Sequence, residues 1–194
     1  MRSVVLWDVM GTLVHDPFYV EMPEFFGVSF EALLQSLKPG PWVEFELGQR
    51  SEDSFLGDFF ADGRDFDRVG FVDAVRSAYR WMPGLEKLVS ELHEDGRPMH
   101  AFSNYPIWYQ MIEERLALSR YIEWSFVSCN MRLRKPDAAA YAHVLNELGV
   151  DAGQCVFIDD RSSNCEAARE AGIHSILFEG VDALRASLSD AGVL

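Results

Sequence analysis

The chain has 194 residues, of which 48% are hydrophobic, and its 17 basic and 31 acidic residues give a formal net charge of −14. This length and composition are typical of a soluble globular protein with a full core, and no apolar run approaches the about 20 residues that cross a bilayer. A surface this acidic repels nucleic acid and anionic membranes, so we expect neither as a partner.

The first predicted element is a strand, Ser3 to Trp7, which begins close to Met1. We therefore expect no signal or transit segment on the chain. The expected location is the cytoplasm, or the plastid stroma if a transit peptide has been removed.

A long segment without a convincing strand pattern follows, from His15 to Pro83, and it holds 14 of the chain's 25 aromatic residues. Ser29 to Leu37 and Ser51 to Phe60 are predicted helices, with a break at Pro39, Gly40 and Pro41. The segment is too long for a loop, so it is predicted to be a small helical cap domain. Its aromatic residues form either the packed core of a helical bundle, the more common role, or a pocket for a flat substrate.

The rest of the chain alternates strand and helix patterns. The predicted strands are Met99 to Phe102, Trp124 to Ser128, Cys155 to Ile158 and Ser175 to Phe178. The predicted helices run from Leu85 to near Gly96, from Asp137 to Gly149, and from Ser163 to Ala171, the last capped by a Ser or Asn. This alternation predicts an α/β fold with a doubly wound parallel sheet, whose core domain comprises residues 1–14 and 84–194 around the 15–83 cap.

Polar residues follow four of the predicted strands at the point where each ends: these are Asp8, then Ser103 and Asn104, then Lys135 in a basic turn, then Asp159 and Asp160. Singly, each has an ordinary role in a turn, a cap or a salt bridge, such as one from Arg161 to the paired carboxylates. The carboxyl ends of parallel strands meet at one edge of the sheet, so we expect all of them to converge on one crevice.

In this order the motifs D-V-M-G-T, S-N, K-P and D-D resemble those of the haloacid dehalogenase-like hydrolase superfamily, with a Rossmann-like core and a small helical cap. The resemblance implies a phosphatase of small phosphorylated metabolites, with Asp8 as nucleophile and Lys135 holding Asp8 and the phosphoryl group. The phosphate-binding residues it implies are Ser103, Asn104 and Thr12. The metal ligands it implies are Asp8, the backbone carbonyl of Met10, Asp159 and Asp160, holding Mg²⁺.

The chemistry of phosphoryl transfer agrees with these roles. The reaction depends on positioning and on positive charge near the phosphoryl oxygens. Lys135 and a cation supply that charge, and oxygen-only ligands suit Mg²⁺ better than zinc.

Met10 departs from the superfamily's phosphatases, which usually carry at this position an aspartate that protonates the leaving oxygen and then activates water. Methionine does neither, and general acid–base catalysis contributes roughly 10²- to 10⁴-fold, or about 3 to 5 kcal/mol. His15, Asp16 or a metal-ordered water is a candidate substitute in a slow or specialised phosphatase. Two alternatives remain: a haloacid dehalogenase, which needs no such acid but usually lacks the paired acidic motif, and a binding or regulatory protein that no longer turns over.

Three segments narrow the resemblance to the plant-plastid flavin mononucleotide (FMN) hydrolases: Phe59 to Asp67, Phe102 to Tyr109 and Phe157 to Arg161. This group implies FMN or a related flavin precursor as substrate. Tyr105, Trp108 and Tyr109 then either meet the flavin ring or pack in a helix core, since Trp108 shares a helical face with Met111 or Ile112. The sequence is compatible with a monomer or a homodimer.

Overall fold

The structure is a computed structural model that describes residues 3–194. Its centre is one five-stranded sheet with the order β3-β2-β1-β4-β5, in which every pair of neighbours is parallel. The strands are β1 (Val4–Trp7), β2 (Met99–Ser103), β3 (Glu123–Val127), β4 (Cys155–Asp159) and β5 (His174–Leu177). All five predicted strands are present, and the predicted α/β fold is confirmed.

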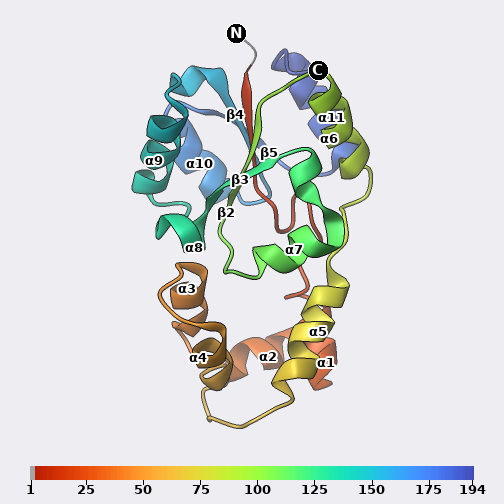
Figure 1. Cartoon of the computed structure of the whole chain (residues 1–194), viewed down its shortest axis with the longest axis vertical. Helices are drawn as coiled ribbons and strands as arrows, with labels where there is room; N and C mark the ends of the chain where they lie inside the picture. Colours follow the sequence, from red (N-terminus) through yellow and green to blue (C-terminus); the bar gives the residue numbers. More distant parts are fainter. Residues whose placement is uncertain (1–2) are drawn as a thin grey trace.

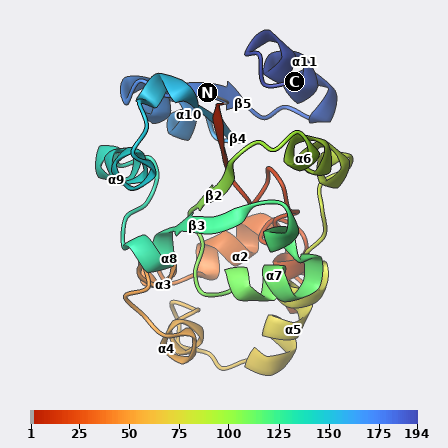
Figure 2. The same cartoon turned by 45° about the horizontal axis from the view of Figure 1, so that its top comes forward.

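Helices cover both faces of the sheet, as Figures 1 and 2 show. The elements of this part of the chain are α6 (Leu85–Glu94), α7 (Tyr109–Leu116), η1 (Leu118–Arg120), α8 (Ser128–Met131), α9 (Ala138–Leu148), η2 (Ala152–Gln154), α10 (Ser162–Glu170) and α11 (Val181–Asp190). Successive side chains of β1 point to opposite faces. Val4 and Leu6 accordingly pack in the cluster that includes Tyr141 of α9, while Val5 and Trp7 pack in the larger one with Leu88 of α6.

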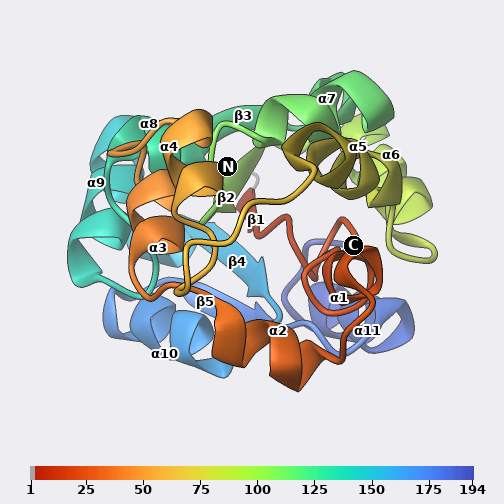
Figure 3. The ribbon, with the colours of Figure 1, turned by 90° about the horizontal axis from the view of Figure 1, so that it is seen from below.

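Five short helices join β1 to α6 and gather below the carboxyl ends of the strands (Figure 1). They are α1 (Glu21–Phe26), α2 (Phe30–Ser36), α3 (Pro41–Glu46), α4 (Glu52–Gly57) and α5 (Arg68–Ala78). Viewed from below, they surround the ends of β1, β2 and β4 (Figure 3). The predicted domain boundaries fall in the connections on either side of this helical part, and the division into two domains stays a prediction.

Local side chains explain where several of these helices begin. Ser29 accepts a hydrogen bond from the Ala32 N–H at 3.2 Å, and Ser51 accepts one from the Ser54 N–H at 3.3 Å, so both act as N-caps. The predicted side-chain cap of α10 is wrong. Its N-cap residue is Arg161, whose side chain makes no capping hydrogen bond. The Asn164 amide does not cap the helix, because it donates to the Asp159 carboxylate.

The aromatic residues of the helical part form a packed core. Phe45 and Phe55 are stacked with their centroids 4.8 Å apart, and Phe59, Phe60 and Phe71 pack with them in one buried cluster. The same cluster includes residues of the sheet and its helices, so the cap and the core share one apolar interior. The bundle-core interpretation is therefore confirmed for these residues.

Gly48 marks a tight contact between the end of α3 and α8. It has φ +66°, and a Cβ added there would lie 2.3 Å from the backbone oxygen of Cys129. We expect Gly48→Ala to lower the free energy of unfolding by about 1–3 kcal/mol, because the clash adds to the strain of a left-handed alanine. Denaturant unfolding measures the loss. Gly63→Ala is the control, since Gly63 has φ +70° but open space around it; equal losses in the two variants would contradict a rigid contact at Gly48.

Candidate active site

Lys135 joins the ends of three strands in the interior of the protein. Its ammonium lies 2.7 Å from Asp8 Oδ1, 2.6 Å from Asp159 Oδ2 and 2.6 Å from the Phe102 carbonyl oxygen. Asp8 follows β1, and its N–H donates to the Ile158 carbonyl at 2.9 Å, which ties it to β4. The predicted convergence of Asp8, Lys135 and Asp159 is thus present in the structure.

Asn104 fixes the backbone of the lysine rather than facing outward. Its Oδ1 accepts from the Lys135 N–H and its Nδ2 donates to the Lys135 carbonyl, both at 2.8 Å. Both ends of the amide are therefore occupied, and the geometry favours a positioning role for this side chain. Its predicted contact with phosphate stays a prediction.

Asp159 is held in place by a residue that the sequence reasoning did not single out. The buried Asn164 donates from Nδ2 to both carboxylate oxygens of Asp159 at 3.0 Å, and the Arg161 N–H donates to Oδ1 at 2.8 Å. Only its place in the first turn after D-D, where Asn usually serves as a helix cap, hinted at a role.

Asp8, Asp159 and Asp160 form a carboxylate cluster in which one oxygen of each lies within 4.8 Å of the others. Burial, opposed by the charge of Lys135 and reinforced by Asp159 and Asp160, raises the pKa of Asp8 to about 7. Burial and the charge of Asp159 also raise the pKa of Asp160. Burial lowers the pKa of Lys135, but Asp159 and Asp8 raise it above its ordinary value. Such a donor set fits a hard cation bound through oxygen.

The turn after Asp8 passes very close to the last of these acids. Gly11 has φ +82°, and a Cβ there would lie 2.7 Å from Asp160 Oδ2. A side chain at this position would displace the carboxylate, so the glycine is required both for the turn and for the close approach.

Two hydroxyl groups, one in the turn after β1 and one at the end of β2, are buried without a partner among residues 3–194. Thr12 and Ser103 are both fully buried, and within residues 3–194 neither side-chain oxygen makes a hydrogen bond. Leaving a buried hydroxyl unpaired costs about 1–3 kcal/mol. Such groups suit a ligand with acceptor oxygens, which agrees with the predicted phosphate contacts.

Two of the three candidate substitutes for the missing acid are side chains, His15 and Asp16, and their surroundings differ. His15 Nε2 is engaged by Glu21, with contacts of 2.7 and 2.9 Å to its two oxygens. Asp16 accepts a hydrogen bond from the Phe18 N–H at 3.0 Å. Burial raises the pKa of Asp16, against the lowering effects of that N–H and of Arg161. Of these two side chains, Asp16 is therefore the one that makes no ion pair within residues 3–194.

A buried carboxylate from α3 reaches the basic turn beside Lys135. Glu46 is 5% exposed, and its Oε2 lies 2.9 Å from the Arg134 guanidinium. Its Oε1 accepts from the Trp42 indole at 3.2 Å, and its carbonyl accepts from Ser128 Oγ at 2.6 Å. No local pattern indicates this pair, because its members are far apart along the chain.

The three aromatic residues after the S-N motif are committed to packing. The Tyr105 hydroxyl is 2.8 Å from that of Tyr79, and the Trp108 indole donates to Glu52 from a buried position. Tyr109 packs on Trp124 with centroids 5.2 Å apart. The packing interpretation is confirmed for Tyr105 and Trp108, which are both almost fully buried.

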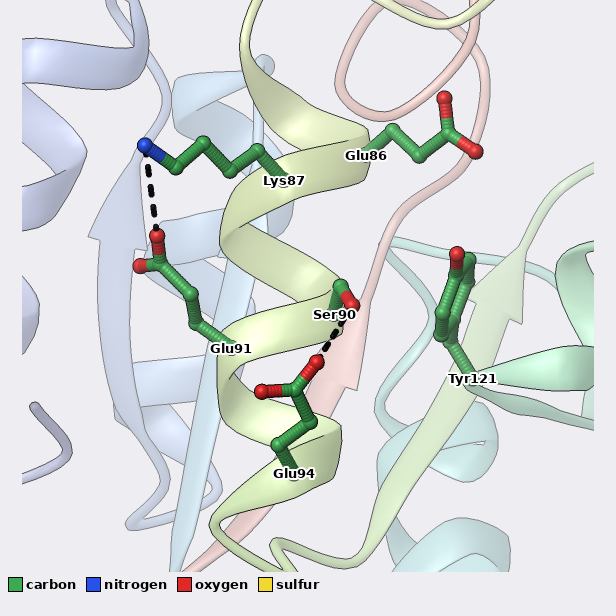
Figure 4. Close-up of a pocket in the computed structure, with 6 residues that line it drawn as sticks. All are labelled: Glu86, Lys87, Ser90, Glu91, Glu94 and Tyr121. Atoms are coloured by element: carbon green, nitrogen blue, oxygen red, sulfur yellow. Dashed lines mark hydrogen bonds and ion pairs between the residues drawn. The ribbon is translucent and has the colours of Figure 1, made fainter.

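A separate surface groove of about 460 Å³ runs along α6 (Figure 4). It is lined by Glu86, Lys87, Ser90, Glu91, Glu94 and Tyr121. Its one lysine pairs with Glu91 at 3.9 Å, so the groove is acidic and repels a phosphate group. It contains none of the residues predicted to take part in the chemistry.

Comparisons with known proteins agree with the geometry. A family model described as haloacid dehalogenase-like hydrolase matches residues 3–172. Flavin mononucleotide hydrolase 1 of Arabidopsis thaliana, described as chloroplastic, is 45% identical over 190 residues, which cover 98% of this chain and 78% of that protein.

Two solved structures share the fold. A haloacid dehalogenase family enzyme of Bacteroides thetaiotaomicron, in complex with magnesium and inorganic phosphate, has a TM-score of 0.74 at 20% identity and covers 91% of this chain and 94% of its own. The L-2-haloacid dehalogenase of Xanthobacter autotrophicus, with chloropropionic acid covalently bound, has a TM-score of 0.68 at 16% identity. The match covers 100% of this chain and 85% of the dehalogenase chain. Within residues 3–194, no helix has the length and apolar character of a membrane span.

Proposed function

The chain belongs to the haloacid dehalogenase-like hydrolase family and is a hydrolase, and we propose that it removes phosphate from a small phosphorylated metabolite through a covalent intermediate on Asp8. The observation that carries the proposal is the ammonium of Lys135 between Asp8 and Asp159, together with the buried hydroxyls of Ser103 and Thr12, which make no hydrogen bond within residues 3–194. This arrangement offers a nucleophile, a fixed positive charge and free donors for phosphoryl oxygens within one buried site.

Each residue has a distinct part in the proposed reaction. An Asp8 oxygen forms a bond to phosphorus while the bond from phosphorus to the ester oxygen breaks, and that oxygen takes up a proton as it leaves. Water then attacks the phosphorus and releases inorganic phosphate and free Asp8. Throughout, Lys135 holds Asp8 by its 2.7 Å contact, and Ser103 and Thr12 bind phosphoryl oxygens.

The carboxylate cluster is the proposed place of Mg²⁺, with Asp8, Asp159, Asp160 and the Met10 carbonyl as ligands. When bound, Mg²⁺ supplies positive charge to the transferring phosphoryl group. Asp8, Asp159 and Asp160 place three carboxylate oxygens within 4.8 Å of one another, and the pKa values of Asp8 and Asp160 are raised in spite of Lys135 and Arg161, which supports a cation there.

We propose Asp16 as the group that compensates for Met10. Within residues 3–194 it is the one of the two candidate side chains that makes no ion pair, and burial raises its pKa and so favours its protonated form. A protonated carboxyl is what the departing ester oxygen requires.

FMN or a related phosphorylated flavin is the proposed substrate, because the Arabidopsis relative that is 45% identical is described as an FMN hydrolase. The cytoplasm or the plastid stroma is the proposed compartment, since the same relative is described as chloroplastic.

One assay tests the proposal. Purified protein with Mg²⁺ is expected to release phosphate from FMN in preference to sugar and nucleoside monophosphates, and EDTA is expected to abolish the release until excess Mg²⁺ is added. Phosphate release is measured against a matched Asp8→Asn sample. Activity that survives EDTA would overturn the metal-dependent mechanism. Release no faster than in the Asp8→Asn sample would favour a binding protein, and metal-independent halide release from 2-haloacids would select a dehalogenase.

A further inference from the structure

A buried carboxylate of the helical part contacts the turn that carries the reactive lysine. Glu46 is the last residue of α3, and its Oε2 lies 2.9 Å from the guanidinium of Arg134, the residue before Lys135. Glu46 is 5% exposed, and its other oxygen accepts from the Trp42 indole at 3.2 Å. Within residues 3–194 the Arg134 guanidinium has no other partner. The position of the Arg134 side chain therefore depends on α3.

The turn between Arg134 and Asp137 is tight. The Asp137 N–H donates to the Arg134 carbonyl at 3.0 Å, which closes the four-residue turn that contains Lys135. Asn104 binds the N–H and the carbonyl of Lys135, each at 2.8 Å. Because the turn is short and hydrogen-bonded at these points, a displacement of Arg134 moves the backbone of Lys135. The ammonium of Lys135 then loses its alignment with Asp8, which it contacts at 2.7 Å.

The same glutamate contacts a second loop of the site through its backbone. The fully buried Ser128 donates from Oγ to the Glu46 carbonyl at 2.6 Å, and its Oγ accepts from the Tyr105 N–H at 2.9 Å. Tyr105 lies two residues after Ser103, in the loop that follows β2. In Figure 1, α3 lies directly below α8, which Ser128 begins. Glu46 is thus linked by short contacts to both the Lys135 turn and the Ser103 loop.

We propose that Glu46 is a positioning residue, which docks the cap on these two loops and sets the place of the Lys135 ammonium through Arg134. The inference rests on the proposed function, which it deepens by assigning a residue that acts on the phosphoryl group without touching it. A buried ion pair gains little net stability, because desolvation of both charges offsets their attraction, so the geometry that the pair fixes explains it better. The Arg134 side chain is 33% exposed, so without Glu46 its guanidinium can turn into water.

Glu46→Gln tests the inference, because it keeps the shape of the side chain and removes the charge that holds Arg134. A misplacement of about 1 Å costs up to roughly 10²-fold in rate, so kcat/KM is expected to fall by roughly 10- to 10²-fold. The factor should be the same for FMN, glycerol phosphate and p-nitrophenyl phosphate, because Lys135 acts on the phosphoryl group that these esters share. Calorimetry with Mg²⁺ present measures the binding of inorganic phosphate, which should weaken as well.

Glu44→Gln is the matched control, since Glu44 lies on the same helix and pairs with Arg50 of the cap at 2.7 Å. It is expected to keep the wild-type kcat/KM and phosphate affinity. Arg134→Gln removes the other half of the contact from a partly exposed position, so it reports on the pair even if Glu46→Gln folds poorly. The double variant should lose no more than either single variant, and Arg134→Lys, which keeps the charge, should retain part of the rate.

The outcomes separate a positioning role from its alternatives. Glu46→Gln and Arg134→Gln variants that match Glu44→Gln in kcat/KM and phosphate affinity, and differ only in melting temperature, would reduce the pair to a structural contact and overturn the inference. A loss confined to one ester would also overturn it, because Glu46 would then contact the leaving group. Losses that add in the double variant would show that the two residues act separately. Weaker phosphate binding in Glu46→Gln, in a protein that hydrolyses no ester, would support the positioning role and overturn the phosphatase.

Discussion

Phosphate release from every substrate is expected to fall by at least roughly 10⁴-fold when Asp8 is replaced by Asn, because removing the nucleophile of a covalent mechanism removes most of its rate enhancement. An amide oxygen is a poor nucleophile and carries no charge to pair with the Lys135 ammonium, which lies 2.7 Å from Asp8 Oδ1 in the native protein. Steady-state phosphate release from FMN, with Mg²⁺ present, measures the loss.

The structure gives reasons to expect that this variant folds. Asn has the shape of Asp, and Lys135 keeps its contacts with Asp159 and the Phe102 carbonyl. Thermal unfolding of the variant beside the wild type checks this point. Asp73→Asn is the activity control, since Asp73 is exposed on α5 and pairs with Arg76 of the same helix at 3.1 Å. It is expected to keep the full rate.

A trapping experiment separates the nucleophile from a merely structural acid. Rapid denaturation during turnover of labelled phosphate ester is expected to leave label on the wild-type protein and none on Asp8→Asn. A variant that kept more than a tenth of the wild-type rate, or that still became labelled, would show that the covalent bond forms elsewhere.

The sheet and most of the reacting groups could be predicted because their signals are local. Each strand is a short apolar run that ends at a polar residue, and parallel pairing brings such ends together whatever the length of chain between them. Asp8, Ser103, Lys135 and Asp159 were therefore identifiable one by one, without knowledge of their contacts.

The supporting contacts could not be predicted in the same way, because they depend on how distant segments meet. Asn164 looks like a helix cap until the position of the Asp159 carboxylate is known. Glu46 lies in an acidic, aromatic stretch, and nothing local indicates that it is buried against Arg134. The same limit applies to Tyr105 and Trp108, for which helical spacing was equally compatible with packing and with ligand contact.

Met10→Asp restores a carboxyl at the position where related phosphatases usually carry their general acid. A positioned acid usually contributes roughly 10²- to 10⁴-fold, of which Asp16 already supplies a part, so we expect turnover of an alkyl phosphate ester to rise by up to roughly 10²-fold. That of an aryl ester should rise much less, because a phenolate leaves readily without a proton. Asp8, Asp159 and Asp160 would raise the pKa of the added carboxyl and favour the protonated form that donates. Steady-state rates on the two esters give the comparison.

Met10→Asn is the matched control, since it has the shape of aspartate but no titratable proton and should give no gain on either ester. Met10 is half-buried against the core cluster, so both variants lose similar apolar contacts, and their melting temperatures should fall together. Equal gains on the alkyl and aryl esters in Met10→Asp would remove the reason for interpreting Met10 as a missing acid.

Combining this substitution with Asp16→Asn identifies the group that now supplies the proton. If Asp16 protonates the leaving oxygen, Asp16→Asn lowers alkyl-ester turnover by on the order of 10²-fold in the wild type and has little effect once Met10→Asp has provided another acid. The alkaline limb of the wild-type pH–rate profile should also change on removal of Asp16, because a general acid acts in its protonated form and burial raises the pKa of Asp16. An Asp16→Asn effect of the same size in both backgrounds would assign Asp16 to the structure of the loop, and the proton would then have to come from water.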